Sequence, residues 1–305
     1  MATPVRIVEV GPRDGLQNEP RTVTPAQRVA LVEALVASGL TTVEAGSFVS
    51  PKWVPQMAGS DAVLRGLPAR DGIRYPVLVP NLKGMEAAVA AGAREVALFV
   101  AASESFSRRN INCSIGESFE RALPVMEMAK AHGIVVRGYV SCVLGCPYEG
   151  EVALPAVASV AERLVGIGCS EVSLGDTIGV GTPARARRMV EAVAKAVPID
   201  RLAIHFHDTR GQALANVLAC LEAGISVIDS AAGGLGGCPY AAGASGNLAT
   251  EDLLYMLDGL GVDTGVDLDR LLDAVAFIAH GLGRPPRSKV YAALRGDRGE
   301  GQSGR

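Results

Sequence analysis

Two histidines separated by one residue, His205 and His207, stand at the end of a short apolar run. The run Arg201–His205 is typical of a β-strand, and alternate residues of a strand point to the same face of a sheet. Both imidazoles are therefore predicted to face one point, where they can bind a divalent cation. The chain has only four histidines, which favours a metal site here. A hydrogen-bonded histidine pair at the mouth of a barrel, without metal, is the alternative.

A second group of polar residues follows the first apolar run, in the segment GPRDGLQNE over residues 11–19. Asp14 can supply a carboxylate ligand to a divalent cation. Arg13 is always charged and can stabilise a developing oxyanion. Glycines on both sides of this pair expose the backbone to a ligand. The alternative is a local salt bridge within a turn.

A third candidate is the glycine-rich segment GGLGGCPY over residues 233–240. Four glycines before a single cysteine are typical of a mobile lid that carries one reactive group, here the thiol of Cys238. The Gly-Lys-Ser/Thr ending of a phosphate-binding loop is missing. A flexible connector with a small buried cysteine is the alternative.

Three further polar residues are candidates for the same site. Asn247 precedes a predicted helix, so it either starts that helix or completes a metal site with its carbonyl oxygen. Glu44 lies at the end of one predicted strand and Asp176 follows another, and each is interpreted either as a catalytic group or as a partner that orients Arg13 or a histidine. Hydrogen bonding and packing at the barrel mouth are favoured for Asn81, Ser103, Glu104 and Cys142.

The elements that must position these residues alternate along the chain. Short apolar runs predict strands over Val5–Val10, Thr42–Ala45, Arg74–Val79, Glu95–Val100, Val135–Val140, Glu171–Leu174, Arg201–His205 and Ser226–Asp229. Helical periodicity predicts helices over Pro25–Ser38, Pro51–Arg65, Leu82–Ala91, Ile115–His132, Leu154–Gly166, Pro183–Ala196, Gly211–Ala223 and Thr250–Leu260. A further helix is predicted over Leu268–His280.

Eight strand–helix pairs predict an α/β fold, a closed (β/α)8 TIM barrel with additional C-terminal helices. An open doubly wound sheet is the alternative, but no Gly-x-Gly-x-x-Gly sequence follows the first strand. The unusual polar residues all follow the carboxyl ends of strands, where barrel enzymes carry their active sites. We therefore predict an enzyme with one catalytic barrel over residues 1–285 and a partly disordered tail over residues 286–305.

Composition restricts the partners. A length of 305 residues suits one barrel of about 250 residues with additions. A net charge of −3 argues against nucleic acid and anionic membranes, and no apolar run reaches the roughly 18 residues of a membrane span. The six cysteines contain no Cys-x-x-Cys pair, and no signal peptide is recognisable. We expect a cytoplasmic protein with no nucleic-acid or membrane partner.

Together these motifs resemble a known enzyme family. Arg13-Asp14-Gly15-x-Gln17, Glu44, His205-x-His207 and Asn247 resemble the metal-dependent lyases and synthases that act on acyl-CoA and α-keto acids. Within that group, GPRDGLQNE, SLGDTIGVGTP, HFHDTRGQALAN and GGLGGCPYAAGASGN resemble the 3-hydroxy-3-methylglutaryl-CoA (HMG-CoA) lyase family in particular. The resemblance covers roughly Val5 to Gly283, nearly the whole chain.

The resemblance implies cleavage of (S)-HMG-CoA to acetoacetate and acetyl-CoA with Mg²⁺ or Mn²⁺, a reaction of leucine degradation and ketone-body formation. It implies that the metal ligands are Asp14, His205, His207 and Asn247. A homodimer is expected by analogy with other barrels of this kind.

The chemistry of this reaction suggests further roles. Arg13 would stabilise the enolate oxygen, and Cys238 would protonate the enolate carbon. Asp176 or a metal-bound histidine would take the hydroxyl proton, and Glu44 would orient Arg13 or the metal shell. Substrate contacts, mostly at the CoA thioester end, are expected from Arg13, Gln17, Asn110, Ser114 and Thr177.

Three alternative functions remain at this point. A lyase for a related 3-hydroxy-3-alkylglutaryl-CoA, or another tertiary 3-hydroxyacyl-CoA, would use the same catalytic residues. A condensing synthase of the same superfamily is disfavoured because this chain has no room for the added C-terminal regulatory domain of those proteins. A non-catalytic barrel that senses acyl-CoA or metal would not need the cation of Arg13.

Overall fold

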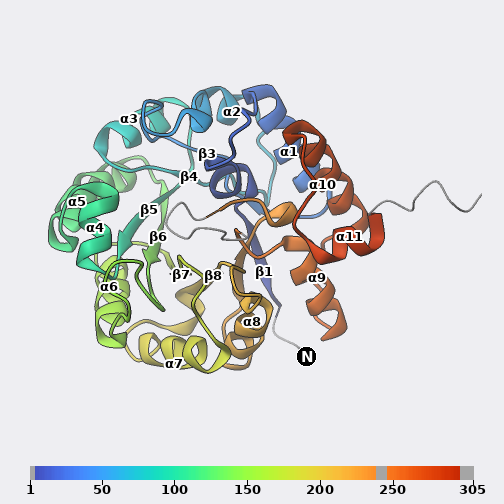
Figure 1. Ribbon diagram of the computed structural model, residues 1–305. Helices are drawn as coiled ribbons and strands as arrows, with labels where there is room; N and C mark the ends of the chain where they lie inside the picture. Colours follow the sequence, from blue (N-terminus) through green and yellow to red (C-terminus); the bar gives the residue numbers. More distant parts are fainter. Residues whose placement is uncertain (1–3, 238–245, 296–305) are drawn as a thin grey trace, which may run out of the picture.

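The structure is a computed structural model that describes residues 4–237 and 246–295. Its sheet contains the parallel strands β1 (Arg6–Glu9), β2 (Thr42–Val43), β3 (Gly46–Ser47), β4 (Val77–Leu78), β5 (Glu95–Ala101), β6 (Val135–Ser141), β7 (Glu171–Asp176), β8 (Leu202–Phe206) and β9 (Val227–Ser230). Figure 1 shows these strands at the centre of a ring of helices.

The sheet closes on itself through the segment that contains β2 and β3. Its strand order is β2-β1-β9-β8-β7-β6-β5-β4-β3, so β2 pairs with β1 at one end and β3 pairs with β4 at the other. Only Glu44 and Ala45 separate β2 from β3, and the predicted second strand, Thr42–Ala45, covers β2 and these two residues but stops before β3. The eight predicted strands therefore form a closed barrel, and the prediction of a TIM barrel is confirmed.

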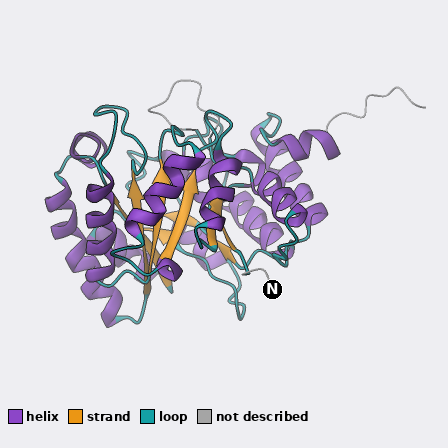
Figure 2. Ribbon diagram, turned by 90° about the horizontal axis from the view of Figure 1, so that it is seen from below, coloured by secondary structure: helices purple, strands orange, loops and turns teal. Residues whose placement is uncertain are grey.

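Helices follow the strands in the predicted alternation. They are α1 (Pro25–Ala37), α2 (Ser60–Gly66), α3 (Leu82–Ala90), α4 (Glu104–Ile111), α5 (Ile115–Ala131), α6 (Leu154–Gly166), α7 (Pro183–Val193), α8 (Ala213–Glu222), α9 (Thr250–Gly259), α10 (Leu268–Leu282) and α11 (Lys289–Arg295). Figure 2 shows the strands enclosed between these helices. Among the described helices, none combines the length and the apolar character needed to cross a bilayer.

The structure corrects two predicted elements and adds one helix. The single helix predicted over Pro51–Arg65 is a short 3₁₀ helix, η2 (Pro55–Met57), followed by α2, because Gly59 takes a left-handed conformation (φ 72°) between them. Arg201 ends the 3₁₀ helix η3 (Ile199–Arg201) instead of beginning β8. Helix α4 was not predicted, and Ser103 caps its first turn through its side chain.

Part of the predicted tail is ordered on the barrel. Helix α11 lies within residues 286–305, and the side chain of Asp252 in α9 accepts hydrogen bonds from Ser288 Oγ (2.7 Å) and Val290 N (2.8 Å). The rest of the tail that was predicted to be partly disordered, residues 296–305, lies outside the described residues. The predicted division into a barrel over 1–285 and a tail stays a prediction.

Side chains alternate between two environments along the strands. Val136 and Val140 of β6 belong to the large apolar core between sheet and helices, whereas Arg137 and Tyr139 of the same strand point into the barrel. Arg137 reaches Asp229 of β9, a strand that is not its neighbour in the sheet. The barrel interior therefore contains charged groups, and these lie beneath the mouth where the candidate site is built.

Candidate active site

Arg13 and Asp14 lie on a single wide turn, the π-helical segment η1 (Gly11–Gly15) that follows β1. Gly15 N donates to Val10 O at 3.1 Å, which closes the turn, and such π turns occur often at functional sites. Arg13 donates from Nη1 to Asp14 Oδ1 at 2.7 Å and from Nε to Glu44 Oε2 at 2.8 Å. The local salt bridge considered as an alternative is thus present, and it lies within the site.

The two histidines meet Asp14 at the carboxyl end of the barrel. Ligand atoms of Asp14, His205 and His207 all lie within 4.8 Å of one another. The two imidazole rings are 5.3 Å apart between centroids, so the strand does direct both toward one face. His205 is in β8 and His207 directly follows it, whereas Asp14 comes from the start of the chain. This arrangement favours the metal site over a metal-free histidine pair.

Asn247 joins the same cluster through an unusual backbone pairing. The segments 206–208 and 246–248 run antiparallel: Leu248 N donates to Phe206 O (3.1 Å) and Asp208 N donates to Gly246 O (3.0 Å). Asn247 Nδ2 then donates to Asp14 Oδ2 at 2.9 Å. The N-cap of α9 is Ala249, so Asn247 does not start that helix. The structure therefore supports the metal-site reading of Asn247.

The charges of the cluster influence one another strongly. Burial acts to raise the pKa of Asp14, but Arg13 and the two imidazoles outweigh it and lower that pKa to about 2. Burial and the neighbouring His205 lower the pKa of His207 to about 4. Burial also opposes protonation of His205, but its hydrogen bond to Asp229 and the charge of Asp14 raise its pKa. An ionised carboxylate and a neutral imidazole are the forms in which Asp and His bind metals.

Asp229 supports His205 from inside the barrel. Its Oδ2 lies 3.3 Å from His205 Nδ1, and Arg137 holds the carboxylate with two hydrogen bonds of 2.7 and 3.0 Å. Ser173 Oγ adds a third at 2.9 Å. Carboxylates commonly orient metal-binding imidazoles in this way. Sequence reasoning missed this role, although charged residues inside otherwise apolar strands are a usable signal.

The donor set fits a divalent cation. The Nδ1 atom of His207 and the Oδ1 atom of Asn247 are buried and have no hydrogen-bond partner within the described residues. Buried polar atoms are rarely left without partners, so two such atoms beside Asp14 point to an absent ligand. A mixed set of oxygen and nitrogen donors suits Mg²⁺ or Mn²⁺, and Asp14, His205, His207 and Asn247 would hold the ion.

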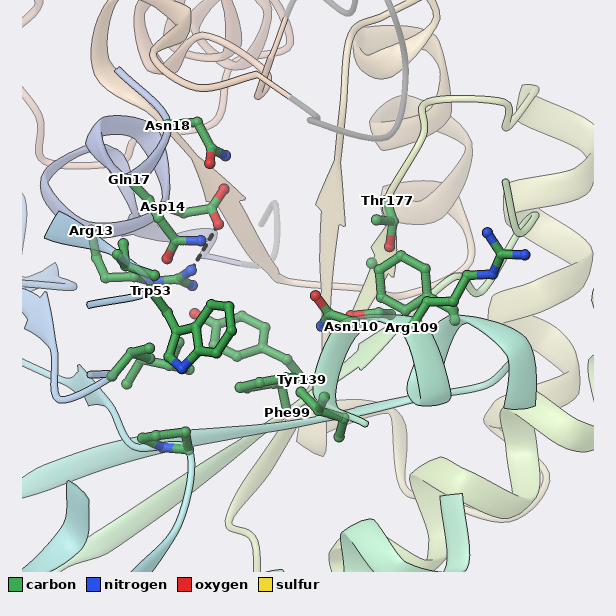
Figure 3. Close-up of a pocket in the computed structure, with 18 of the residues that line it drawn as sticks. Arg13, Asp14, Gln17, Asn18, Trp53, Phe99, Arg109, Asn110, Tyr139 and Thr177 are labelled. Carbon is green, nitrogen blue, oxygen red and sulfur yellow. Dashed lines mark hydrogen bonds and ion pairs between the residues drawn. The ribbon is translucent and has the colours of Figure 1, made fainter. Parts of the chain in front are cut away.

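A cavity of about 710 Å³ opens beside this cluster and has both polar and apolar walls. Figure 3 shows Arg13, Asp14 and Gln17 on one side, Arg109, Asn110 and Thr177 on the other, and Trp53 and Tyr139 between them. Gln17, Asn110 and Thr177 were predicted to contact substrate and do line the cavity. Trp53, Phe99, Arg109 and Tyr139 line it as well and were not predicted, because neither their spacing nor a motif singles them out.

Glu44 and Asp176 lie behind the cavity and do not line it. Glu44 is fully buried, and its Oε2 also lies 3.3 Å from the hydroxyl of Tyr139, so it orients Arg13 as predicted. Asp176 accepts hydrogen bonds from Val180 N (3.1 Å) and Gly181 N (2.7 Å), one on each carboxylate oxygen. It therefore holds the loop after Thr177, and the structure does not place it as a base for substrate.

Ser114 is also placed away from the cavity. It is the N-cap of α5, where its Oγ accepts a hydrogen bond from Glu117 N at 3.1 Å and Glu117 bonds back to Ser114 N. The predicted substrate contact of Ser114 is therefore not supported. A serine in a capping-box sequence carries this signal in the sequence itself.

The glycine-rich segment meets the site up to Gly237, and Cys238 lies outside the described residues. Gly236 has φ 115°, and a Cβ there would lie 2.7 Å from Asn247 Nδ2. Asn247 Nδ2 in turn donates to Leu235 O at 3.1 Å. Gly236 thus allows the backbone of this segment to approach the side chain of Asn247 closely. The sequence suggested flexibility as the function of these glycines.

Known proteins share this architecture. The family described as HMGL-like matches residues 4–278. A mitochondrial hydroxymethylglutaryl-CoA lyase of Bos taurus is 60% identical over 289 residues, which are 95% of this chain and 89% of the relative. A 3-hydroxy-3-isohexenylglutaryl-CoA/hydroxymethylglutaryl-CoA lyase of Pseudomonas aeruginosa is 59% identical over 290 residues, 95% of this chain and 97% of the relative.

The fold agrees equally well with a solved structure. The crystal structure of hydroxymethylglutaryl-CoA lyase from P. aeruginosa has a TM-score of 0.94 and 59% sequence identity, and the match covers 96% of this chain and 99% of that one. Sequence and structure therefore agree over nearly the whole chain with enzymes named HMG-CoA lyase. The chain belongs to the HMGL-like family.

Proposed function

We propose that this protein is a divalent-metal-dependent carbon–carbon lyase that cleaves (S)-HMG-CoA to acetoacetate and acetyl-CoA. The observation that carries the proposal is the meeting of Asp14, His205 and His207 within 4.8 Å, beside the guanidinium of Arg13. Relatives at 59–60% identity over 95% of the chain are named for this activity. Mg²⁺ or Mn²⁺ is the cation we expect, because the Asp14 carboxylate and the Asn247 carbonyl are the oxygen donors that these ions prefer.

When bound, the cation would supply Lewis acidity to the oxygen of the C3 hydroxyl group of the substrate. Cleavage removes the proton of the C3 hydroxyl, which becomes the keto group of acetoacetate, and breaks the C2–C3 bond. The electron pair of that bond moves into the thioester carbonyl and forms an enolate. Protonation of the enolate carbon then yields acetyl-CoA.

Arg13 stabilises the negative oxygen of the enolate. Its Nε and Nη1 are engaged by Glu44 and Asp14, whereas Nη2 has no hydrogen-bond partner within the described residues. Arg13 is 6% exposed and lines the cavity, so this free donor is fixed and poorly solvated. Fixed donors of this kind stabilise transition-state charge better than mobile solvated ones.

Cys238 is the proposed donor of the proton to the enolate carbon. Gly237, which directly precedes it, lines the cavity, and its carbonyl oxygen accepts a hydrogen bond of 3.0 Å from Asn18 Nδ2. Replacement of Cys238 by alanine or serine should abolish most of the turnover and leave circular dichroism and melting temperature unchanged. Full activity in such a variant would exclude the cysteine from the reaction.

The hydroxyl proton passes to a group that faces the cavity. Asp176 accepts a backbone N–H hydrogen bond on each carboxylate oxygen and does not line the cavity, which argues against it as the base of this step. The other predicted acceptor of this proton is a metal-bound histidine, and His205 and His207 both line the cavity. The CoA end of the substrate would meet Asn110 and Thr177, with Arg109 adding a positive charge suited to an anionic ester, and Gln17 would contact the substrate on the side of Arg13.

The test is an assay of acetoacetate release from (S)-HMG-CoA by the purified protein. Activity should require Mg²⁺ or Mn²⁺, disappear with a chelator and return when the metal is restored. No release of acetoacetate with either metal would overturn the proposal.

A second substrate range is favoured by the apolar wall of the cavity. The wall is formed by Val49, Trp53, Leu78, Pro80 and Phe99. These residues come from β3 to β5 and the loops after them, and β4 lies opposite β8 in the closed sheet, so the wall faces the histidines. One relative is named for both isohexenylglutaryl and methylglutaryl esters. We infer that longer alkyl groups at C3 are also accepted and lie against this wall.

A series of 3-hydroxy-3-alkylglutaryl-CoA esters with increasing alkyl length tests this range. The wild-type protein should cleave the longer esters, and Leu78→Phe should lower kcat/KM for them more than for HMG-CoA. The kcat/KM of Leu78→Phe for HMG-CoA is thus the control for its kcat/KM with the longer esters. Equal losses of kcat/KM for short and long esters would show that the apolar wall does not recognise the alkyl group.

Three properties stay predictions. We propose a role in leucine degradation, a cytoplasmic location and a homodimer, and we expect neither nucleic acid nor membrane as a partner. Growth of a deletion strain on leucine, cell fractionation and sedimentation of the purified protein test the first three.

A further inference from the structure

Glu9, at the end of β1, is a fully buried carboxylate that plays no part in the reaction described above. Its Oε1 accepts hydrogen bonds from Gly11 N (2.8 Å) and Ala232 N (2.9 Å). Its Oε2 accepts one from Thr250 Oγ1 (2.6 Å). One side chain therefore ties together three backbone segments that are far apart in the sequence.

Each of these three segments leads directly into the candidate site. Gly11 begins η1, which carries Arg13 and Asp14. Ala232 begins η4 (Ala232–Gly234), which leads through Leu235 to the cavity-lining Gly237. Thr250 begins α9, three residues after Asn247.

The contact between Glu9 and the start of η1 is unusually close. A Cβ at Gly11 would lie 2.5 Å from Glu9 Oε1, so only glycine lets the backbone approach the carboxylate this closely. The third contact is supported from the other side, because Ser230 Oγ lies 2.8 Å from Thr250 Oγ1. These bonds fix where each segment leaves the barrel.

We propose that Glu9 is a positioning residue that sets the relative placement of the segments carrying Arg13 with Asp14, Gly237 and Asn247. It acts through these segments and does not touch substrate or metal. The inference rests on the proposed function for its catalytic consequence, but the placement of Asp14 against Asn247 is measurable through metal binding alone.

The physical basis is the cost of unpaired buried donors. Loss of the carboxylate leaves the N–H groups of Gly11 and Ala232 without their acceptor, and a buried unpaired donor costs about 1–3 kcal/mol. The segments are expected to shift to recover partners. A shift at Gly11 moves Asp14, and a shift at Ala232 moves Leu235, whose carbonyl oxygen accepts a hydrogen bond from Asn247 Nδ2. Loss of such a supporting contact typically weakens metal binding by about 10–100-fold.

Binding of Mn²⁺ to the metal-free protein, measured by calorimetry or electron paramagnetic resonance, is the first readout. Glu9→Ala should weaken Mn²⁺ binding by about 10–100-fold and lower kcat for HMG-CoA. Glu9→Gln should restore both, because its amide oxygen still accepts from Gly11 N and Ala232 N while its NH₂ group donates to Thr250. Thr250→Val, a milder break, should produce a smaller loss in the same direction.

The matched control is Glu95→Ala, which removes another buried carboxylate from a strand. Glu95 lies at the amino end of β5, where Arg74 Nε donates to it at 2.7 Å, away from the mouth of the barrel. This variant should lower the melting temperature and leave Mn²⁺ affinity unchanged.

Two results would overturn the proposal. One is a Glu9→Ala protein that melts earlier but binds Mn²⁺ as tightly as the wild type. The other is a Glu9→Gln protein as impaired as Glu9→Ala, which would make the charge and not the hydrogen bonds responsible. A wild-type protein that fails to cleave HMG-CoA while the Mn²⁺ results come out as expected would refute the proposed function alone.

Discussion

Two buried arginines of this barrel form similar ion-pair clusters, one at the mouth and one in the interior. Arg13 at the mouth contacts Glu44 and Asp14, and Arg137 in the interior contacts Glu171, Tyr139 and Asp229. Both guanidinium carbons lie close to the ring of Tyr139, at 5.6 and 4.9 Å from its centroid. In composition the two clusters are nearly the same.

They differ in how completely their polar atoms are paired. Within the described residues, Arg137, Tyr139, Glu171 and Asp229 have no buried side-chain atom without a partner; Nη1 of Arg6, which pairs through Nη2 with Glu171 at the edge of this cluster, is unpaired. The mouth cluster leaves Glu44 Oε1, His207 Nδ1 and Asn247 Oδ1 unpaired. A completed network is what a structural cluster requires, whereas an incomplete one implies a ligand that completes it. Burial and charge alone would not have separated the two.

The largest expected effect is on turnover at the mouth. Arg13→Gln removes the cation that stabilises the enolate, so kcat should fall about 10³-fold or more. Mn²⁺ binding should persist, because Asp14, both histidines and Asn247 remain. Steady-state assays with calorimetry of Mn²⁺ binding distinguish the two quantities, and near-normal turnover would contradict the assigned role.

The corresponding change in the interior should act on stability. Arg137→Met leaves the buried Asp229 without its cation, and breaking a buried pair in this way costs about 3–5 kcal/mol. The free energy of unfolding, measured in urea, should fall by that amount. Were Arg137→Met as stable as the wild type, the interior cluster would not be the structural member of the pair.

Loss of one proposed ligand should act first on metal binding. His207→Ala removes one nitrogen donor, and Mn²⁺ affinity should fall by about 100-fold or more, beyond the usual cost of losing a supporting contact. The Mg²⁺ or Mn²⁺ concentration needed for half-maximal activity should rise in proportion. An unchanged metal requirement would remove His207 from the site.

The smallest expected effect is on the pH dependence of stability, through Glu9. This buried carboxyl group is paired with hydrogen-bond donors and not with a guanidinium. Burial raises the pKa of Glu9 from 4.5 to about 7, against the opposing hydrogen bonds of Thr250, Ala232 and Gly11. The folded protein therefore favours the protonated acid, and the contribution of this group to stability is lost as pH rises from about 4.5 through about 7.

The difference between wild type and Glu9→Gln isolates that contribution, because the amide stays neutral. The two proteins should be similarly stable near pH 5. By pH 8 the wild type should have lost on the order of 2–3 kcal/mol of unfolding free energy relative to the variant. Glu251, whose pKa burial also raises to about 7, is common to both proteins and cancels. A difference that does not change with pH would place the ionisation of Glu9 outside this range.

The sequence predicted the fold better than it predicted element boundaries. The alternation of apolar runs with helical periods repeats eight times, and each unit is short enough for local residues to determine it. The break in Pro51–Arg65 depends on one left-handed glycine, and α4 begins at the cap residue Ser103 after a strand. Helix boundaries of this kind depend on a few local hydrogen bonds, and the periodicity of apolar residues does not reveal these bonds.

Within the site, prediction succeeded where a motif fixed the geometry. His205 and His207 share a face because they are two residues apart in extended backbone, at the end of β8 and directly after it. Asp176 and Ser114 have the right chemistry at the right end of a strand or loop, yet their oxygens bond to nearby backbone N–H groups. A short polar side chain can satisfy the local backbone or face a cavity, and the sequence does not distinguish these outcomes.

Residue types and spacing determined the closed barrel, the side of it that carries chemistry, and the imidazole pair. Only the folded chain decided which carboxylates serve the reaction: Asp14 meets residues almost two hundred positions later, Asp229 and Glu9 support the site from within, and Asp176 holds a loop. The reason is that periodicity is a local property of the chain. Contacts across the barrel mouth depend on the closure of the whole sheet.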